Sequence, residues 1–340
     1  MMLRTRAHAR AGLIGNPSDG YFGKTISFIV RNFGAEITCY ESPRVVIMPG
    51  PRDHLTFQSR EALVSDVRLN GYYGGIRLIK ATIKAFSDSC DERGIVLDRR
   101  NFTIEYQTNI PVRVGLAGSS AIITATMRAL MTFYGVEIDL PLLPNLILRV
   151  ETEELGIGAG LQDRVIQVYE NAVYMDFDRE LIAQQGYGHY EYVDLASLPP
   201  LFIAYHDNLS EGTEITHNDL RSRFNRGDRA VVEGMKTFAG FAEEARQLIA
   251  TGRGREIGPL MDANFDLRER LVRISEGNIR LIQTGRRLGA HTKFAGSGGA
   301  IVGAYDGDPE RLERLRAAYE AFGARLIQPI IEPILHEVHA

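Results

Sequence analysis

The sequence predicts an α+β protein built from two domains. Segments with strand-like and helix-like patterns are mixed along the chain without a regular alternation, which favours an α+β fold over a doubly wound sheet. With 340 residues, the chain is long for one compact core and suits two domains. Because Pro199-Pro200 interrupts the patterned segments, we expect one domain over residues 1–198 and a second over residues 199–340.

The first domain is expected to begin with strands and to continue with helices. A short apolar segment at 11–14 leads into a glycine-rich loop, and the next segments are rich in β-branched and aromatic residues. Ile76, Ile79, Ile83 and Phe86 recur at the spacing of one helix face. The expected strands lie at 25–30, 35–40, 44–48, 102–108 and 173–177, and the expected helices at 70–90, 121–134 and 142–154.

The second domain is expected to combine a small number of strands with long helices. A buried strand is predicted at 201–205, directly after the proline pair, and another at 300–304, after a glycine turn. Apolar residues near the helical period predict helices at about 229–250, 257–270, 277–288 and 310–322.

The composition excludes several classes of protein. A net charge of −4, with Lys and Arg scattered along the chain, gives no electrostatic reason to bind nucleic acid or an anionic membrane. No apolar run approaches the roughly 20 residues that cross a bilayer. Cys39 and Cys90 lack a nearby Cys or His partner and indicate a reduced protein without a zinc site. We therefore expect a cytoplasmic protein.

The loop Pro111–Ala121 is the most informative local pattern. Gly115 and Gly118 let the backbone approach a ligand, and Ser119 or Ser120 can cap a helix that begins at Ala121. The first N–H groups of such a helix attract an anion, which suggests a phosphate. The loop has neither the Lys-Ser/Thr of a Walker loop nor the glycine spacing of the dinucleotide fingerprint. Taken alone, it is equally consistent with a tight turn and a capped helix.

Two further glycine clusters, Gly156–Gly160 and Gly296–Gly299, make the phosphate site the favoured interpretation of the loop. In chain order, Arg10–Asp19, Pro111–Ala121 and Lys293–Ala300 resemble the three motifs of the GHMP family of small-molecule kinases. The resemblance covers essentially the whole chain. It implies an N-terminal domain like domain 2 of ribosomal protein S5, a ferredoxin-like C-terminal domain, and phosphorylation of a small hydroxyl by ATP with Mg²⁺. It places the ATP phosphates on Gly115, Leu116, Ala117, Gly118, Ser119, Ser120 and Ala121.

Within the family, Asn16–Thr25 and Gly160–Tyr169 look most like glucuronokinase, which makes a sugar 1-phosphate from glucuronic acid. Asn16-Pro17 departs from the usual Glu-His, so the hydroxyl contacts of galactokinase are not transferred to this chain. Other acceptors within the family, namely mevalonate, a heptose, fucose or galactose, stay open. So does a kinase-derived regulatory protein that binds ligand without turnover. A monomer and a homodimer are both compatible with the sequence.

The resemblance makes Asp163 the candidate base, because a carboxylate beside the acceptor can orient its hydroxyl and accept the proton. The alternative is an N-cap for a helix that starts near Arg164. Lys24 is a second catalytic candidate, since a cation there would lower the pKa of the acceptor hydroxyl or neutralise the γ-phosphate. Its alternative is a solvated lysine at a strand edge.

The remaining site residues are also implied by the resemblance. For Mg²⁺ it suggests Ser120 and Glu151, with Glu153 as the neighbouring choice and a solvated helix face as the alternative. For a substrate carboxylate it offers Arg10 and Arg164 without choosing between them. The acceptor side is completed by Asn16, Asp19, Gly296 and Gly298, with a simple Asp-Gly turn as the alternative for Asp19.

Overall fold

The computed structural model describes residues 2–51, 53, 57–70, 74–207, 209 and 220–332, with the backbone alone at 66–70. Its first half is organised around a six-stranded sheet in the order β3-β4-β2-β5-β6, with β1 paired to β2. The strands are β1 (Met2–Ile14), β2 (Lys24–Ser42), β3 (Val46–Ile47), β4 (Asn101–Thr108), β5 (Ala172–Asp176) and β6 (His189–Tyr192). The long strand β2 is central because it pairs with β1 along its length, with β5 near its start and with β4 near its end.

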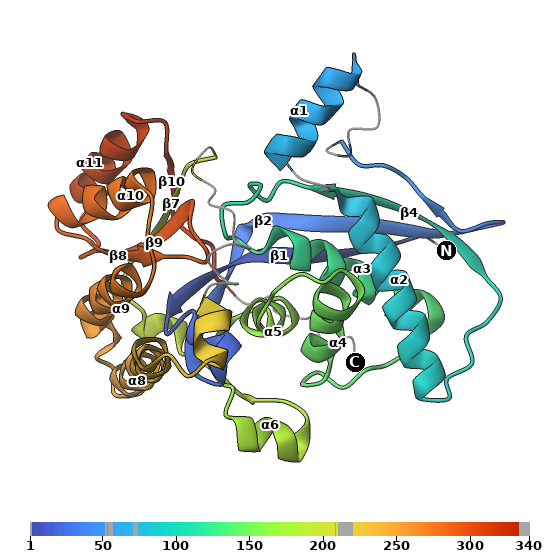
Figure 1. Cartoon of the computed structure of the whole chain (residues 1–340), viewed down its shortest axis with the longest axis horizontal. Coiled ribbons are helices and arrows are strands. Elements are labelled where there is room, and N and C mark those ends of the chain that lie inside the picture. The colour runs from blue at the N-terminus through green and yellow to red at the C-terminus, as the bar shows by residue number, and fades with distance from the viewer. Residues whose placement is uncertain are drawn as a thin grey trace.

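Helices cover one face of this sheet (Figure 1). They are α2 (Gly75–Glu92), α3 (Gly118–Tyr134), α4 (Leu143–Arg149), a π-helical turn (Val150–Glu154) and α5 (Gln162–Tyr169). The apolar helix α3 contacts both β1 and β2 and lies between α2 and α5. Two short helices, α1 (Arg60–Asn70) and α6 (Arg179–Gln185), stand away from the sheet in the figure.

The second half forms a four-stranded antiparallel sheet in the order β10-β7-β9-β8. Its strands are β7 (Leu201–Tyr205), β8 (His291–Phe294), β9 (Ala300–Ala304) and β10 (Arg325–Ile327). Helices α8 (Arg229–Ala250), α9 (Gly258–Leu271) and α10 (Glu276–Arg287) lie between β7 and β8, and α11 (Pro309–Glu320) lies between β9 and β10. Strands and helices in this order give the expected ferredoxin-like arrangement.

The two sheets share a hydrophobic core. One cluster of buried side chains runs from Ala7 and Phe28 in the first sheet through Ala242 of α8 to Val302 in the second. Helix α8 supports this junction because it contacts β1 and β2. The division into domains 1–198 and 199–340 therefore stays a prediction. All strands of the first sheet lie before residue 199, and all strands of the second sheet lie after it.

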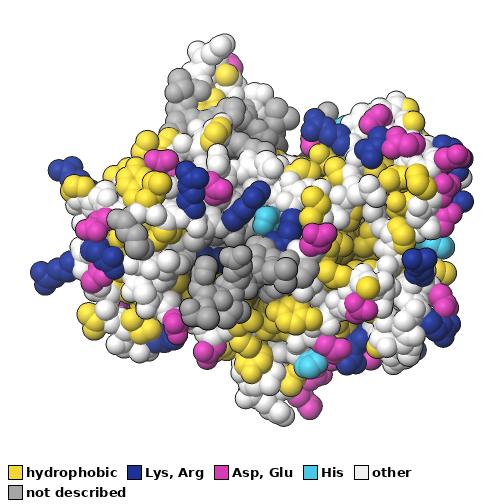
Figure 2. Space-filling model, turned by 180° about the vertical axis from the view of Figure 1, so that it is seen from behind, with side chains coloured by type: hydrophobic (Ala, Val, Ile, Leu, Met, Phe, Trp, Pro, Cys, Tyr) yellow, Lys and Arg dark blue, Asp and Glu magenta, His cyan; other side chains and the backbone are white. Residues whose placement is uncertain are grey.

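The surface carries charges of both signs interspersed over the face seen in Figure 2. Among the described residues, no helix is long and apolar enough to cross a membrane. Cys39 and Cys90 are buried free thiols.

Most predicted elements are present, and the differences have physical causes. The strands expected at 25–30 and 35–40 are one strand, β2, whose pairing with β1 shifts register near Gly34. The helix expected at 142–154 ends at Arg149 and continues as a π-helical turn. The helix expected at 70–90 begins at Gly75, and residues 71–73 lie outside the described part. The sequence prediction missed α1, α6, β6, β8, β10 and most of β1.

The predicted serine cap of α3 is wrong. The helix begins at Gly118, three residues before the expected start, and Ala117 occupies the N-cap position with a left-handed backbone (φ +63°) and no side-chain cap. Ser119 and Ser120 are thus inside the first turn. The Ser120 hydroxyl donates to the Ala117 carbonyl at 3.2 Å instead of capping an N–H group.

Candidate active site

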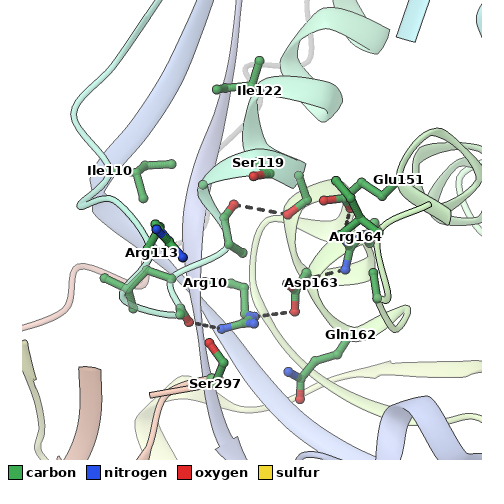
Figure 3. A pocket seen from close by; sticks show the side chains of 18 of the residues that line it. Arg10, Ile110, Arg113, Ser119, Ile122, Glu151, Gln162, Asp163, Arg164 and Ser297 are labelled. Carbon is green, nitrogen blue, oxygen red and sulfur yellow. Dashed lines mark hydrogen bonds and ion pairs between the residues drawn. The ribbon is translucent and has the colours of Figure 1, made fainter. Parts of the chain in front are cut away.

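A cavity of about 680 Å³ lies where the three glycine-rich loops meet (Figure 3). Its walls come from β1, the loop before α3, the loop before α5, and the turn between β8 and β9. Most of the predicted site residues line it, namely Arg10, Asn16, Asp19, Gly115, Leu116, Ala117, Gly118, Ser119, Ser120, Glu151, Asp163, Arg164 and Gly296. Among the predicted residues, Lys24, Ala121 and Gly298 are not part of the described lining.

The loop before α3 has the geometry of an anion cradle. Gly115 has a positive φ of +74°, and the loop delivers the N-terminus of the 17-residue helix α3 to the cavity. The N–H groups at a helix start have no intrahelical acceptor and carry partial positive charge, so a phosphate is stabilised there. Gln167 of α5 fixes the loop from behind, donating to the Ala117 carbonyl at 2.9 Å. Ala121 is fully buried behind the cradle.

The third glycine loop packs directly on this cradle. A Cβ at Gly296 would lie 2.2 Å from the Gly115 carbonyl oxygen, closer than atoms can approach. Arg268 of α9 holds the third loop by donating to the carbonyls of Gly296 (2.8 Å) and Ser297 (3.2 Å). Gly298 allows this turn because its φ of +138° is a backbone conformation that side-chain-bearing residues rarely adopt. The absence of side chains at these glycines thus lets two loops that are far apart in the sequence form one wall.

Arg10 connects three parts of the site. Its Nε donates to Asp163 Oδ1 at 2.6 Å, and its Nη1 donates to the carbonyls of Gly115 (2.7 Å) and Ala295 (3.1 Å). The Arg10 side chain is 7% exposed and that of Asp163 is 17% exposed, so water screens the ion pair weakly. One guanidinium therefore fixes the candidate base, the phosphate cradle and the third loop relative to one another.

Asp163 lies in the first turn of α5, after the N-cap residue Leu161, so its alternative reading as an N-cap is wrong. Next to it, Arg164 forms an ion pair with Glu151 and donates to the Gly160 carbonyl at 2.7 Å. Burial, together with the charge of Arg10, lowers the pKa of Arg164. Figure 3 shows Glu151 and Arg164 side by side at the edge of the cavity. Arg164 is thus occupied by a carboxylate of the protein itself.

Asp19 approaches the same group from the short 3-10 turn Ser18–Tyr21. A Cβ at Gly160 would lie 2.2 Å from Asp19 Oδ2, so the glycine makes room for this carboxylate. Burial, with the negative charge of Asp163, raises the pKa of Asp19 to about 6, although Arg10 and Arg164 oppose the shift. The turn after β1 and the start of α5 therefore place two carboxylates, Asp19 and Asp163, in one cavity.

Asn16 lines the cavity, but its side chain also has a structural partner. Its Oδ1 accepts a hydrogen bond of 2.6 Å from Lys293, whose ammonium also donates to the carbonyls of Gly12 and Phe294. Burial, with the charges of Arg268 and Arg10, holds the pKa of Lys293 well below its usual range. Asn264 of α9 donates to the Asn16 carbonyl at 3.1 Å. Sequence reasoning did not foresee this buried lysine, because nothing local in the sequence distinguishes it from a surface lysine.

Lys24 is not brought to the cavity. Its ammonium lies 2.8 Å from Glu243 Oε2 and 3.3 Å from Asp176 Oδ2, at the contact between β2, β5 and α8. Burial acts to lower the pKa of Lys24, but the hydrogen bond that it donates to Glu243, with the neighbouring Tyr174 and Asp176, raises the pKa overall. The structure therefore gives Lys24 a role in joining the two halves of the chain and does not support the catalytic expectation.

The residues expected to hold Mg²⁺ are compatible with that ion. Ser120 and Glu151 are both buried and both line the cavity beside the phosphate cradle. A hydroxyl and a carboxylate suit a hard cation that keeps several waters and binds phosphates. In the described ranges no three His, Cys, Asp or Glu side chains cluster as a metal site, and Mg²⁺ in kinases does not need such a cluster. Glu153 and Glu154 instead pair with Arg149 and Lys84.

The comparison with known proteins decides the family. Residues 77–171 match the family model described as the GHMP kinases N terminal domain. The protein "Glucuronokinase 1" of Arabidopsis thaliana is 40% identical over 331 residues, which cover 96% of this chain and 91% of that protein. The chain belongs to the GHMP kinase family. It is an ATP-dependent kinase with the α+β fold predicted from its sequence.

Two further relatives support the assignment. The GHMP kinase is 41% identical over 336 residues to "Probable glucuronokinase 2" of Arabidopsis thaliana, covering 97% of this chain and 90% of that protein. Its fold is shared with the Lactococcus lactis galactokinase solved in complex with galactose. That structure covers 98% of this chain and 94% of its own, with a TM-score of 0.75 at 14% identity.

Proposed function

We propose that this GHMP kinase transfers the γ-phosphate of ATP to the anomeric hydroxyl of glucuronate, giving glucuronate 1-phosphate and ADP. The proposal rests on the near full-length similarity to the two Arabidopsis proteins named glucuronokinase. The observation that carries the chemistry is the Arg10 bridge, which sets Asp163 and the phosphate cradle in one cavity. The cytoplasm and either a monomer or a homodimer stay our predictions for location and assembly.

Asp163 can act as the base because its two oxygens differ. Arg10 holds Oδ1 at 2.6 Å, whereas Oδ2 lies 3.5 Å from Arg164 Nη1, too far for a strong hydrogen bond. Oδ2 can therefore accept the proton of an acceptor hydroxyl and orient its oxygen towards the γ-phosphate. Asp19, which lines the same cavity, would hold further hydroxyls of the acceptor.

The charge of the cavity suits two anionic substrates. The described lining holds five arginines (Arg10, Arg77, Arg113, Arg164 and Arg268) and three carboxylates (Asp19, Glu151 and Asp163). A positive excess of this kind favours a triphosphate and a sugar acid over a neutral sugar. Ser120 and Glu151 would hold Mg²⁺, which when bound would neutralise charge that develops on the phosphates.

A panel of acceptors with coupled ADP detection tests the proposal. We expect the highest kcat/KM with glucuronate, against mevalonate, heptose, fucose and galactose as competitors. A higher kcat/KM with one of these competitors would show that it, and not glucuronate, is the preferred acceptor. ATP binding without ADP release on any acceptor would favour a regulatory protein.

The same assay tests the role of Asp163. In Asp163→Asn the amide cannot take the proton, so we expect kcat to fall by about 10²–10⁴-fold. The Kd for ATP should change little, because Asp163 belongs to α5 and not to the loop at the start of α3 that would hold the phosphates. Turnover near that of the unmodified enzyme in Asp163→Asn would reject the assignment of the base.

A further inference from the structure

Gln162, the first residue of α5, carries an amide that the mechanism above does not use. The residue is only 3% exposed and lines the cavity. Its Oε1 is buried and has no hydrogen-bond partner among the residues that the structure describes. In Figure 3 the side chain lies beside Asp163 at the start of the helix.

A second glutamine of the same helix shows what a satisfied amide looks like here. Gln167 donates from Nε2 to the carbonyls of Ala117 (2.9 Å) and His8 (3.2 Å), and its Oε1 accepts from the Thr124 hydroxyl at 3.3 Å. Buried polar atoms in folded proteins almost always have such partners, because an unsatisfied one costs about as much as a lost hydrogen bond. We therefore look for the partner of the Gln162 amide oxygen in the ligand that binds in the cavity.

The chemistry of the amide narrows that partner to a hydroxyl. A carboxylate or phosphate oxygen cannot donate to Oε1, whereas a hydroxyl can donate to Oε1 or accept from Nε2. Arginines also line this cavity, whereas Gln162 is a neutral polar group that directly precedes the candidate base in the chain.

We propose that Gln162 is a specificity-determining residue that binds a ring hydroxyl of the acceptor other than the one that Asp163 orients. The site thereby selects sugar acids that carry this hydroxyl over analogues in which it is replaced by hydrogen. This inference rests on the proposed function, because it takes the acceptor to be a polyhydroxylated ring.

The test compares glucuronate with analogues that lack the hydroxyl at C2, C3 or C4, in the unmodified enzyme and in Gln162→Leu. We expect the unmodified enzyme to lose about tenfold or more in kcat/KM for one of the three analogues, since that analogue leaves the amide unsatisfied. In Gln162→Leu, kcat/KM for glucuronate should fall by a similar factor, and discrimination against that one analogue should disappear.

Gln167→Leu is the matched control, because it removes an amide from the same helix that bonds only to the protein. It should lower kcat/KM for glucuronate and all analogues by a common factor and leave the discrimination intact. Gln162→Met, which is close to glutamine in length, adds a second readout. In the unmodified protein the Gln162 amide oxygen has no partner among the described residues. Its loss in Gln162→Met should therefore not lower the Tm of the ligand-free protein.

Each outcome has a separate meaning. Unchanged discrimination in Gln162→Leu, or a uniform loss like that of Gln167→Leu, overturns the role of Gln162 and leaves the proposed function standing. A clear fall of Tm in Gln162→Met also overturns it, since the amide would then have a structural task. Absence of phosphate transfer to any sugar by the unmodified enzyme would overturn both proposals.

Discussion

Replacement of Arg10 is the perturbation that the geometry makes most informative. Arg10→Met removes one partner of a nearly buried ion pair and leaves Asp163 Oδ1 and the carbonyls of Gly115 and Ala295 without their donor. Breaking a buried pair in this way typically costs about 3–5 kcal/mol. Arg10→Lys keeps the charge but lacks the planar guanidinium, so it can donate to only some of these three acceptors. We expect its free energy of unfolding to fall by about 2 kcal/mol.

Urea unfolding measures these losses, and steady-state kinetics measures their effect on the site. Because the guanidinium joins the base to both loops, misplacement by about 1 Å should lower kcat by about 10²-fold even in Arg10→Lys. Full-length variants that unfold as expected but retain the kcat of the unmodified enzyme would refute the positioning role. Loss of ATP binding alone, with an unaltered kcat at saturation, would also contradict it.

Three further predictions concern groups around the cavity and the junction. Gly296→Ala should weaken ATP binding and lower the Tm, because its Cβ would collide with the Gly115 carbonyl; an unchanged Kd for ATP would contradict the close packing. The pKa of Asp19 is raised from 3.8 to about 6, so its ionisation destabilises the fold at pH 7.5. Asp19→Asn should therefore raise the Tm at pH 7.5 while lowering kcat/KM for the acceptor, and the Tm gain should fade as the pH falls through 6 towards 3.8; a Tm difference independent of pH would reject this. The hydrogen bond from Lys24 holds the pKa of Glu243 at about 2 instead of 4.5, so this pair stabilises the fold fully above pH 4.5 and less as the pH falls towards 2. The Tm deficit of Lys24→Met should shrink over that range, and a constant deficit would count against the ion pair.

The fold was largely predictable where side-chain patterns are strong. Helix α8 follows its expected range because its apolar residues recur at the helical period. Strand β9 follows its range because it is a short, fully buried run after a glycine turn. The N-terminal strand was missed because its inward residues are small: Ala7, Ala9 and Ala11 are buried, yet alanine has low strand propensity.

The site was predictable from its glycines and less so from its charges. Gly115 and Gly296 line the cavity as predicted, and the missing side chain at Gly296 lets their two loops come into contact. The pairing of Glu151 with Arg164 and of Lys24 with Glu243 depends on tertiary contacts between distant segments, which no local pattern encodes. The left-handed Ala117 was equally hidden, because the preference for serine over alanine at an N-cap pointed to the wrong residue.

The most direct measurement of the central claim is the identity of the product. ³¹P NMR of the purified protein with ATP, Mg²⁺ and glucuronate should show ADP and one new phosphomonoester in equal amounts. The new signal should couple to the anomeric proton, which identifies the 1-phosphate, and it should accumulate at least about 10²-fold more slowly with Asp163→Asn. A phosphate on another hydroxyl, or ATP consumption without any phosphorylated sugar, would contradict the account.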